Sequence, residues 1–549
     1  MEDHVESGDI APVPTAAWWQ AAVIYQVYPQ SFADSNADGI GDLPGITSRL
    51  GHLATLGVDA VWLSPFYRSP MRDGGYDVAD YRDVDPMFGT LADFDALLAE
   101  AHRLGLRVIV DIVPNHTSSE HRWFVEALAA PSGSAARDRY IFRQGSGPDG
   151  DEPPNDWQSV FGGLAWTRVA DGEWYLHLFD SSQPDLDWLN REVHAEFEST
   201  LRFWLDRGVD GFRVDVAHGL IKADGLPDVG HTNQGGIIGR DPLPYFDQDG
   251  VHEIYREWRK IIDSYPGERI AVAEAWTSTV ERAARYVAPD ELHQAFNFEY
   301  LFTPWSATDL RASIDGSIAA CGAIGAPPTW VLSNHDVQRH TTRYGALGAA
   351  GLRRARAATL LTMALPGSCY LYQGEELGLP EVTDLPPDAR RDPQWFRTNG
   401  AEPGRDGCRV PMPWSGTTPP FDFSPGESAA PWLPVPASWA SMTAERQAAN
   451  PGSTLSLYRT ALRIRKEHPA LGYGPPLRWL DTPTGVLAFV REPERDTAAG
   501  GAPLTCVVNL TEAPVSLRDV LERADLGPPL LASDRLSGDQ LPPDTAAWW

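Results

Sequence analysis

Three carboxyl groups end or follow apolar, β-branched segments of this sequence, and such segments are typical of strands in a parallel sheet. Asp215 ends GFRVD, Glu274 ends IAVAE, and Asp336 comes three residues after TWVLS. Because the carboxyl ends of parallel strands lie on one side of the sheet, we expect the three side chains to meet there. Two carboxyl groups facing one reacting atom can act as a nucleophile and as a proton donor. The spacing therefore points to acid–base or covalent catalysis.

An arginine and two histidines are expected on the same side of that sheet. Arg213 lies two residues before Asp215 and so on the same face of its strand, while His116 and His335 follow two other strands. Taken singly, each residue has an ordinary alternative, because a carboxylate can cap a helix and a histidine can be a packed core residue. Carboxylates placed together, however, repel one another and shift each other's pKa. We therefore interpret the group as a functional site.

The elements that would position these residues form a repeated unit. An amphipathic stretch ends at a glycine and a β-branched apolar run follows, as in LATLG before VDAVWL and FWLDRG before VDGFRVDV. This order is typical of a helix, its glycine C-cap and a buried strand. Eight predicted strands lie at 24–28, 60–63, 107–112, 211–215, 270–274, 294–298, 329–333 and 369–373. The predicted fold class is therefore α/β, a (β/α)8 TIM barrel.

The intervals between strands also predict the domains. Nearly 100 residues separate the third and fourth strands, far more than one βα unit needs, so we expect an inserted lobe there. A proline-rich excursion at 375–440 would fold over the same end of the barrel, and a small antiparallel β-sandwich would follow the barrel. The predicted ranges are 1–16 for a flexible N-terminal segment, 17–116 and 191–468 for the barrel, 117–190 for the lobe (domain B) and 469–549 for the C-terminal domain.

The charge of the chain argues against several classes of partner. The 549 residues include 75 Asp and Glu against 45 Lys and Arg, a formal charge of −30. Such a surface repels phosphate backbones and anionic lipids, so we expect no nucleic-acid and no membrane partner. No apolar run approaches the roughly 18 residues of a membrane span, and the first residues are acidic where a secretory signal is basic. Four widely spaced cysteines suggest neither disulfides nor a zinc site, and we expect a cytoplasmic protein.

Five motifs resemble conserved regions of the alpha-amylase family of glycoside hydrolases. They are DIVPNH at 111–116, QPDLDW at 183–188, GFRVDVAH at 211–218, VAEAW at 272–276 and SNHD at 333–336. The opening IYQVYPQSFADSNADGIGDLPGI also resembles the α-glucosidase and oligo-1,6-glucosidase branch of that family. The similarity extends from about Trp18 into the C-terminal domain, with all motifs in the family's order.

The resemblance implies a role for each carboxylate. Asp215 would be the nucleophile, Glu274 the general acid/base, and Asp336 the residue that holds sugar hydroxyls and stabilises the transition state. Retaining glycoside hydrolysis needs one ionised carboxylate to attack the anomeric carbon and one protonated carboxyl group about 5 Å away. Arg213, beside Asp215, would keep the nucleophile ionised.

Further positions that match the family would bind the reacting glucose. His116 and His335 would hydrogen-bond the sugar, and Tyr76 would be the aromatic platform on which it stacks. Each has an alternative interpretation, a packed histidine or a loop anchor. Phe161 would line the sugar channel, and Arg339 would face the leaving-group site.

The resemblance also implies that the glucose pocket is closed at its far end. Asp73 would pair there with an arginine, for which Arg409 is the first candidate and Arg405 the second. Such a pair would bind the 4-hydroxyl of a terminal sugar and leave no room for a longer chain, which would make the enzyme exo-acting. The loop around Arg409 departs from the family pattern, since Pro413 and Ser415 stand where Gln and Asp are usual.

The first loop carries oxygen-bearing residues at alternate positions, as a calcium loop requires. The candidate ligands are Asp34, Asn36, Asp38, Ile40 and Asp42. The twelfth position is Gly45 and not Glu, which excludes an EF-hand. Resemblance to the first-loop ion site of α-glucosidases implies a structural Ca²⁺, with Mg²⁺ as the second choice, and the alternative is an acidic turn without metal. No organic cofactor is expected.

Residues and resemblance together predict a retaining, exo-acting α-glucosidase that acts on small-molecule α-glucosides, namely maltose and short maltooligosaccharides. Val216 resembles α-1,6-acting members, but Ala217 and His218 depart from their usual continuation, so we expect α-1,4 cleavage with some α-1,6 tolerance. The alternatives are an oligo-1,6-glucosidase, a transglucosidase or sucrose-isomerase-type enzyme, and an inert carbohydrate-binding or transporter-associated relative. Whether the protein is a monomer or a homo-oligomer is left open.

Overall fold

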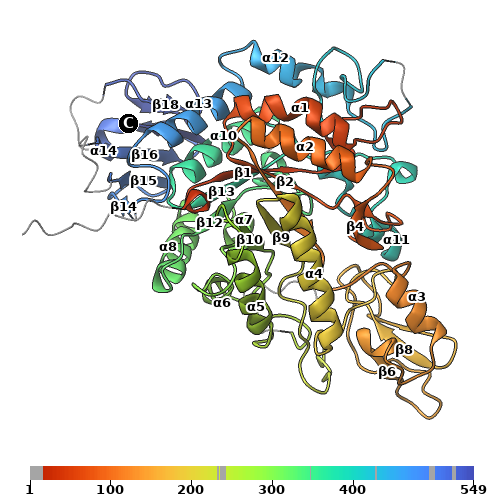
Figure 1. Ribbon diagram of the computed structural model, residues 1–549. Coiled ribbons are helices and arrows are strands. Elements are labelled where there is room, and N and C mark those ends of the chain that lie inside the picture. Colours follow the sequence, from red (N-terminus) through yellow and green to blue (C-terminus); the bar gives the residue numbers. More distant parts are fainter. Residues whose placement is uncertain are drawn as a thin grey trace, which may run out of the picture.

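Figure 1 shows a computed structural model of the protein, which describes residues 17–549 apart from 232–233, 235–242, 346–347, 427–428, 476, 494–500 and 522–526. The predicted N-terminal segment, 1–16, lies outside the described residues. A parallel barrel occupies the centre of the molecule, and the inserted lobe and the C-terminal domain lie on opposite sides of it (Figure 1).

Eight parallel strands form the central sheet, in the order β11-β10-β9-β5-β2-β1-β13-β12. They are β1 (Val23–Val27), β2 (Ala60–Leu63), β5 (Arg107–Ile112), β9 (Gly211–Val214), β10 (Ile270–Ala273), β11 (Gln294–Ala295), β12 (Thr329–Val331) and β13 (Ser368–Tyr372). Each lies within or next to one of the eight predicted segments, and strands that follow one another around the barrel are neighbours in the sheet. This arrangement confirms the predicted TIM barrel, whose strands are buried on both faces as their apolar runs require.

Helices surround this sheet. The longer ones are α1 (Leu43–Leu56), α2 (Leu91–Arg103), α4 (Arg191–Arg207), α5 (Val251–Asp263), α8 (Ala307–Ala323), α10 (Gly348–Ala364) and α13 (Thr454–Glu467). Shorter ones are α6 (Val280–Arg285), α7 (Phe298–Phe302), α9 (His340–Arg343), α11 (Pro393–Arg397) and α12 (Ala444–Ala448). In the described part of the chain, none is long and apolar enough to cross a membrane.

The predicted helix boundaries follow from capping chemistry. Helix α2 begins at a capping box in which Thr90 and Asp93 exchange side-chain and backbone hydrogen bonds. Helices α1 and α4 end at Gly57 and Gly208, whose φ angles of 100° and 102° are left-handed and suit glycine. The repeated order of helix, glycine and strand is therefore confirmed at these positions.

The lobe inserted after β5 is a small antiparallel sheet in the order β6-β8-β7, covered by α3 (Arg122–Ala129). Its strands are β6 (Phe142–Gln144), β7 (Trp166–Arg168) and β8 (Glu173–Leu176). Helix α11, in the excursion after β13, contacts this lobe, since Arg397 Nε donates to the carbonyl of Gly162 at 2.9 Å. A second antiparallel pair, β3 (Tyr67–Arg68) with β4 (Asp80–Val84), follows β2. Lobe and excursion thus meet at the carboxyl end of the barrel.

The C-terminal domain is a five-stranded antiparallel sheet in the order β14-β15-β16-β20-β18, beside a β17-β19 pair. Its elements are β14 (Arg478–Trp479), β15 (Val486–Arg491), β16 (Leu504–Asn509), β17 (Val515–Ser516), α14 (Leu517–Leu521), β18 (Leu531–Ala532), β19 (Gln540–Leu541) and β20 (Thr545–Trp548). The sheet packs on α10, where the buried Trp548 donates through Nε1 to the carbonyl of Leu360 at 3.2 Å. The predicted antiparallel domain is confirmed, and it lies away from the carboxyl ends of the barrel strands (Figure 1).

Candidate active site

A cavity of about 430 Å³ lies at the carboxyl ends of the barrel strands. Seven of the predicted site residues line it: Asp73, Tyr76, His116, Phe161, Asp215, Glu274 and Asp336. The lobe adds Gln158 and Val160, and the excursion adds Gln394 and Arg405. Barrel, lobe and excursion therefore build one cavity between them.

The guanidinium group of Arg213 joins two of the carboxyl groups. Its Nη1 lies 2.6 Å from Asp215 Oδ1, and its Nη2 lies 2.8 Å from Glu274 Oε2. Because the nitrogens of one planar guanidinium are only about 2.3 Å apart, these two oxygens are no more than about 8 Å from each other. That bound includes the separation of about 5 Å that retaining glycosidases use. Both carboxyl groups face the same cavity.

Asp111 shares the same guanidinium group. Its Oδ1 lies 2.9 Å from Arg213 Nη1, and its Oδ2 accepts a hydrogen bond from the Tyr76 hydroxyl at 3.1 Å. Burial raises the pKa of Asp111 to about 7 and the pKa of Asp215 well above its ordinary value, although Arg213 opposes both shifts. One positive charge is shared by three buried carboxyl groups, and Arg213, in contact with Asp215, favours its ionised form, so the role expected of this arginine stays a prediction.

Asp336 lies between two further arginines. Its Oδ1 is 3.0 Å from Arg405 Nη1 and 3.0 Å from Arg409 Nη2. Burial alone would raise the pKa of Asp336, but His335 and the guanidinium groups of Arg405 and Arg409 hold it below its ordinary value. Asp336 therefore presents an ionised carboxylate to the cavity.

The two predicted histidines are buried and uncharged at neutral pH. His116 lines the cavity, and burial lowers its pKa to about 4. His335 lies behind Tyr76, with the two rings stacked at a centroid distance of 5.2 Å and an interplanar angle of 13°. Burial lowers the pKa of His335 well below its ordinary value, and its Nε2 lies 3.3 Å from Asp336 Oδ2. His335 thus supports Tyr76 and Asp336, while His116 is exposed to the cavity.

The acid–arginine pair predicted to close the cavity contains a different arginine from the first candidate. Arg405, not Arg409, pairs with Asp73, at 2.6 Å between Nη2 and Oδ1, and its guanidinium carbon lies 4.8 Å from the centroid of the Phe161 ring. Arg409 is held away because its Nε donates to the carbonyl of His335 at 2.8 Å. The two arginines flank a short 3-10 turn and so point to different neighbours, which their spacing in the sequence does not reveal.

The prediction for Arg339 is also corrected. Its Nη1 and Nη2 donate to the carbonyls of Gln373 and Cys408, each at 2.8 Å, and its guanidinium carbon lies 4.7 Å from the centroid of the Tyr372 ring. Arg339 is buried and does not line the cavity. These contacts join the excursion to the end of β13, and they direct the Arg339 side chain away from the predicted leaving-group site.

Comparison with known proteins agrees with this geometry. Residues 26–474 match the alpha-amylase catalytic domain. The chain belongs to the alpha-amylase family. This family member is a glycoside hydrolase of the α-glucosidase type, since a probable alpha-glucosidase of Rhizobium meliloti (strain 1021) is 40% identical over 526 residues, which cover 91% of this chain and 90% of that protein.

Other relatives of this alpha-amylase-family protein carry different names. An oligo-1,6-glucosidase of Parageobacillus thermoglucosidasius is 36% identical (83% of this chain, 85% of that one), and a trehalose-6-phosphate hydrolase of Bacillus subtilis (strain 168) is 35% identical (83% and 84%). The solved structure of the alpha-glucosyl transfer enzyme XgtA has a TM-score of 0.85 and 38% identity, covering 97% of this chain and all of that one. These names do not resolve the exact specificity.

Several residues of the cavity were not predicted from the sequence of this alpha-amylase-family protein. Trp276, Phe179 and Phe246 supply aromatic surface, and Gln158 and Gln394 supply amides. Trp276 carried a usable signal, because it lies two residues after Glu274 and hence on the same side of the chain where β10 continues. The others come from the lobe and from loops, where no periodic pattern marks the direction of a side chain.

Val216, directly after the predicted nucleophile, has an unusual backbone conformation. Its φ of 45° is left-handed, which for a β-branched residue costs of the order of 1–3 kcal/mol. In this conformation its backbone N–H donates to Glu274 Oε2 at 2.9 Å. The strained residue therefore joins the two predicted catalytic groups through the main chain.

The predicted ion loop is folded by its own side chains. Asp34 Oδ1 accepts from the backbone N–H of Asn36 at 2.9 Å, Asn36 Oδ1 from Asp38 at 2.9 Å, and Asp38 Oδ1 from Ile40 at 2.8 Å, while Asp42 caps α1. No group of three or more His, Cys, Asp or Glu able to hold a metal occurs among the described residues. The donors are nevertheless oxygen atoms of the type that Ca²⁺ prefers, so the ion stays a prediction.

Proposed function

We propose that the protein is a retaining, exo-acting α-glucosidase that removes terminal α-1,4-linked glucose from maltose and short maltooligosaccharides. One observation carries the proposal: Asp215 and Glu274 contact the same guanidinium and face a cavity that the Asp73–Arg405 pair also lines. The volume of about 430 Å³ lies in the range of about 300–1,000 Å³ for small-molecule sites.

The reaction would proceed in two steps that balance in atoms and charge. In the first step Asp215 attacks the anomeric carbon, the bond from that carbon to the aglycone oxygen breaks, and the proton of Glu274 moves to the departing oxygen. In the second step water attacks the same carbon, the ester bond to Asp215 breaks, and Glu274 takes the proton of the water. No metal and no redox change takes part in this scheme.

The ionised groups around the cavity would recognise the non-reducing glucose. Asp336 keeps its negative charge between two arginines and so can accept hydrogen bonds from two sugar hydroxyls. Asp73 and Arg405 together offer an acceptor and a donor to one hydroxyl at the closed end. A chain that continued past this hydroxyl would collide with the pair, which favours terminal cleavage.

The charge of the cavity argues against a phosphorylated substrate. Arg405 is the one lysine or arginine among the described residues that line the cavity, and it already contacts Asp73 and Asp336. A phosphate group on the aglycone needs lysines or arginines of its own. This favours neutral α-glucosides over trehalose 6-phosphate.

A transglucosidase is the second candidate, because the residues beside Glu274 are largely apolar. Val216, Phe246 and Trp276 lie in one apolar cluster and line the cavity. Such a surface can hold the ring of a sugar acceptor and exclude water from the glycosyl-enzyme. In that case the acceptor hydroxyl would replace water in the second step.

A time course on maltose, isomaltose, sucrose and trehalose tests the proposal. We expect free glucose from maltose at the highest kcat/KM, less from isomaltose, and no new disaccharide at low maltose concentration. Glu274→Gln should reduce turnover by about 10³-fold while the variant still binds maltose. Turnover of none of the four sugars by the wild type, or full activity of the variant, would refute the proposal.

We also propose that the loop of Asp34, Asn36, Asp38, Ile40 and Asp42 holds Ca²⁺, or Mg²⁺ as the second choice, in a structural role. Asp34 and Asp42 are buried, and among the described residues their hydrogen-bond donors are neutral groups of the same segment, such as the backbone N–H groups of Gly39 and Gly45, which supports a cation there. The cysteines of the described chain are all free, which suits a reducing compartment, and we propose a cytoplasmic location.

A further inference from the structure

One ion pair and two hydrogen bonds hold the carboxyl group of Glu274. Oε2 receives Arg213 Nη2 at 2.8 Å and the backbone N–H of Val216 at 2.9 Å. Oε1 receives the indole N–H of Trp276 at 3.1 Å. A proton on Oε2 would face a cation and a second donor, so the proton that Glu274 transfers belongs on Oε1. Trp276 therefore contacts the oxygen that does the chemistry.

The indole that makes this contact is itself fixed. Its ring stacks face to face on Phe298, with centroids 4.0 Å apart and an interplanar angle of 8°. Phe298 is the first residue of α7, whose N-cap Asn297 donates through Nδ2 to Ser317 Oγ at 2.7 Å. An N–H on a fixed ring has a fixed direction, unlike the hydroxyl of a serine or threonine.

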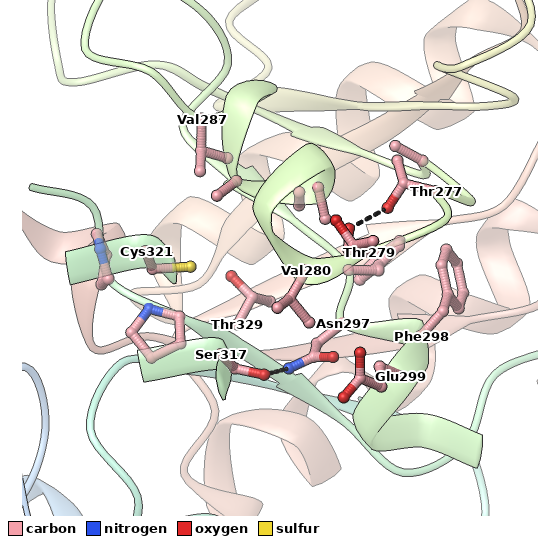
Figure 2. A pocket seen from close by; sticks show the side chains of 17 residues that line it. Thr277, Thr279, Val280, Val287, Asn297, Phe298, Glu299, Ser317, Cys321 and Thr329 are labelled. Atoms are coloured by element: carbon pink, nitrogen blue, oxygen red, sulfur yellow. Dashed lines mark hydrogen bonds between the residues drawn. The ribbon is translucent and has the colours of Figure 1, made fainter. Parts of the chain in front are cut away.

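The segment that follows Trp276 in the sequence is also fixed by hydrogen bonds. Figure 2 shows Thr277, Asn297 and Phe298 around a second cavity, which both chain neighbours of Trp276, Ala275 and Thr277, help to line; the hydrogen bonds of Thr277 and Asn297 are drawn as dashed lines. Thr277 Oγ1 donates to the carbonyl of Thr279 at 2.9 Å, and Thr279 caps α6. The cavity has room for only one or two water molecules, about 40 Å³, so it gives the Phe298 ring, which lines it, little space to move into.

We propose that Trp276 is a positioning residue for the general acid, and that its N–H fixes the rotation of the Glu274 carboxyl group and so the direction in which Oε1 delivers its proton. This inference rests on the proposed function and deepens it. After proton transfer, Oε1 carries negative charge, and the same N–H stabilises it without adding a cation to the cavity.

A purely packing role for Trp276 makes a different prediction. If the indole only filled space or supported the substrate, its loss would slow all α-glucosides alike. If it orients the acid, its loss should slow substrates whose leaving group must be protonated and spare those whose leaving group departs unaided. Maltose, which releases a sugar alkoxide, and α-glucosyl fluoride, which releases fluoride, form such a pair.

Trp276→Phe keeps an aromatic ring at this position and removes the N–H together with the five-membered ring that carries it; the loss of ring volume should affect both substrates alike. We expect kcat/KM to fall about 10- to 100-fold for maltose and less than about threefold for α-glucosyl fluoride. The matched control is Trp305→Phe, which removes an indole N–H bonded to the Asp544 carboxylate at 2.8 Å; neither residue lines the cavity, so the rate on neither substrate should change.

Equal losses on the two substrates, or unchanged maltose hydrolysis, would overturn the inference. If Trp276→Phe does not fold, as judged by its melting temperature, Phe298→Leu provides the decision, because it frees the indole while keeping its N–H and should show the same selective loss on maltose to a smaller degree. A wild-type protein that cleaves neither substrate would instead refute the proposed function.

Discussion

Replacing Asp73 by asparagine should weaken recognition of one sugar hydroxyl while preserving the shape of the cavity. The change removes the charge that lies 2.6 Å from Arg405 and keeps an oxygen and a nitrogen in place. A hydrogen bond to a charged group contributes about 1.5–3 kcal/mol, so kcat/KM for a terminal glucoside should fall about 10- to 150-fold. Arg405 stays paired with Asp336 and Asp392, which limits the loss of stability to less than the about 3–5 kcal/mol of a fully broken buried pair.

The assay compares p-nitrophenyl α-glucoside with its 4-deoxy analogue, on the wild type and on Asp73→Asn. Wild-type protein should prefer the hydroxylated substrate about 10- to 150-fold, and the variant should lose most of that preference. Asp392→Asn is the matched control, because Asp392 also contacts Arg405 but does not line the cavity. The assignment of the closed end would be wrong if Asp73→Asn slowed both substrates equally, or if Asp392→Asn abolished the preference as well.

Three further predictions concern Asp111, the predicted ion loop and Arg339. Burial raises the pKa of Asp111 to about 7, so the folded state keeps a proton that the unfolded state releases near pH 4, and the free energy of unfolding falls as pH rises from about 4 to 7. The melting temperature of Asp111→Asn should therefore decline less steeply with pH than that of the wild type, and an unchanged slope would contradict the shift. Chelation should lower the melting temperature of the wild type, and Ca²⁺ should restore it, whereas the melting temperature of Asp38→Ala should respond to neither. Equal melting temperatures of the wild type with and without chelator would count against the ion. Arg339→Gln should lower the melting temperature and leave the preference for maltose over isomaltose unchanged, while a changed preference with normal stability would return Arg339 to the leaving-group site.

The barrel and the group of carboxyl residues at its rim could be predicted because both depend on regular spacing. Apolar runs mark the strands, glycines mark the helix ends, and the parallel order brings residue 215 and residue 274 to one side whatever the details of packing. Arg213 could be placed beside Asp215 for the same reason, because residues two apart on a strand share a face. What spacing did not reveal is that one guanidinium also serves Asp111 and Glu274.

The contacts that the sequence did not predict lie on irregular segments. Arg405 and Arg409 are four residues apart around a 3-10 turn, and only the fold determines which of them reaches Asp73. Arg339 follows β12 in a motif like the family's, yet its direction is set by two carbonyl groups of the excursion. The residue type and the motif therefore indicate which region of the fold a side chain belongs to, while the residue that it contacts there depends on loop geometry.

The strained backbone at Val216 has a consequence for protein engineering. The Val216 side chain lines the cavity, so under the proposed function it is a natural position at which to alter the preferred linkage. The same residue holds the proton donor by its amide, and it does so from a φ of 45° that glycine or asparagine adopts more readily than valine. Substitutions at position 216 will therefore change both the contact with the substrate and the placement of Glu274. Variants selected for a new glycosidic linkage should be compared on substrates with good and poor leaving groups before a gain in rate is attributed to better substrate binding.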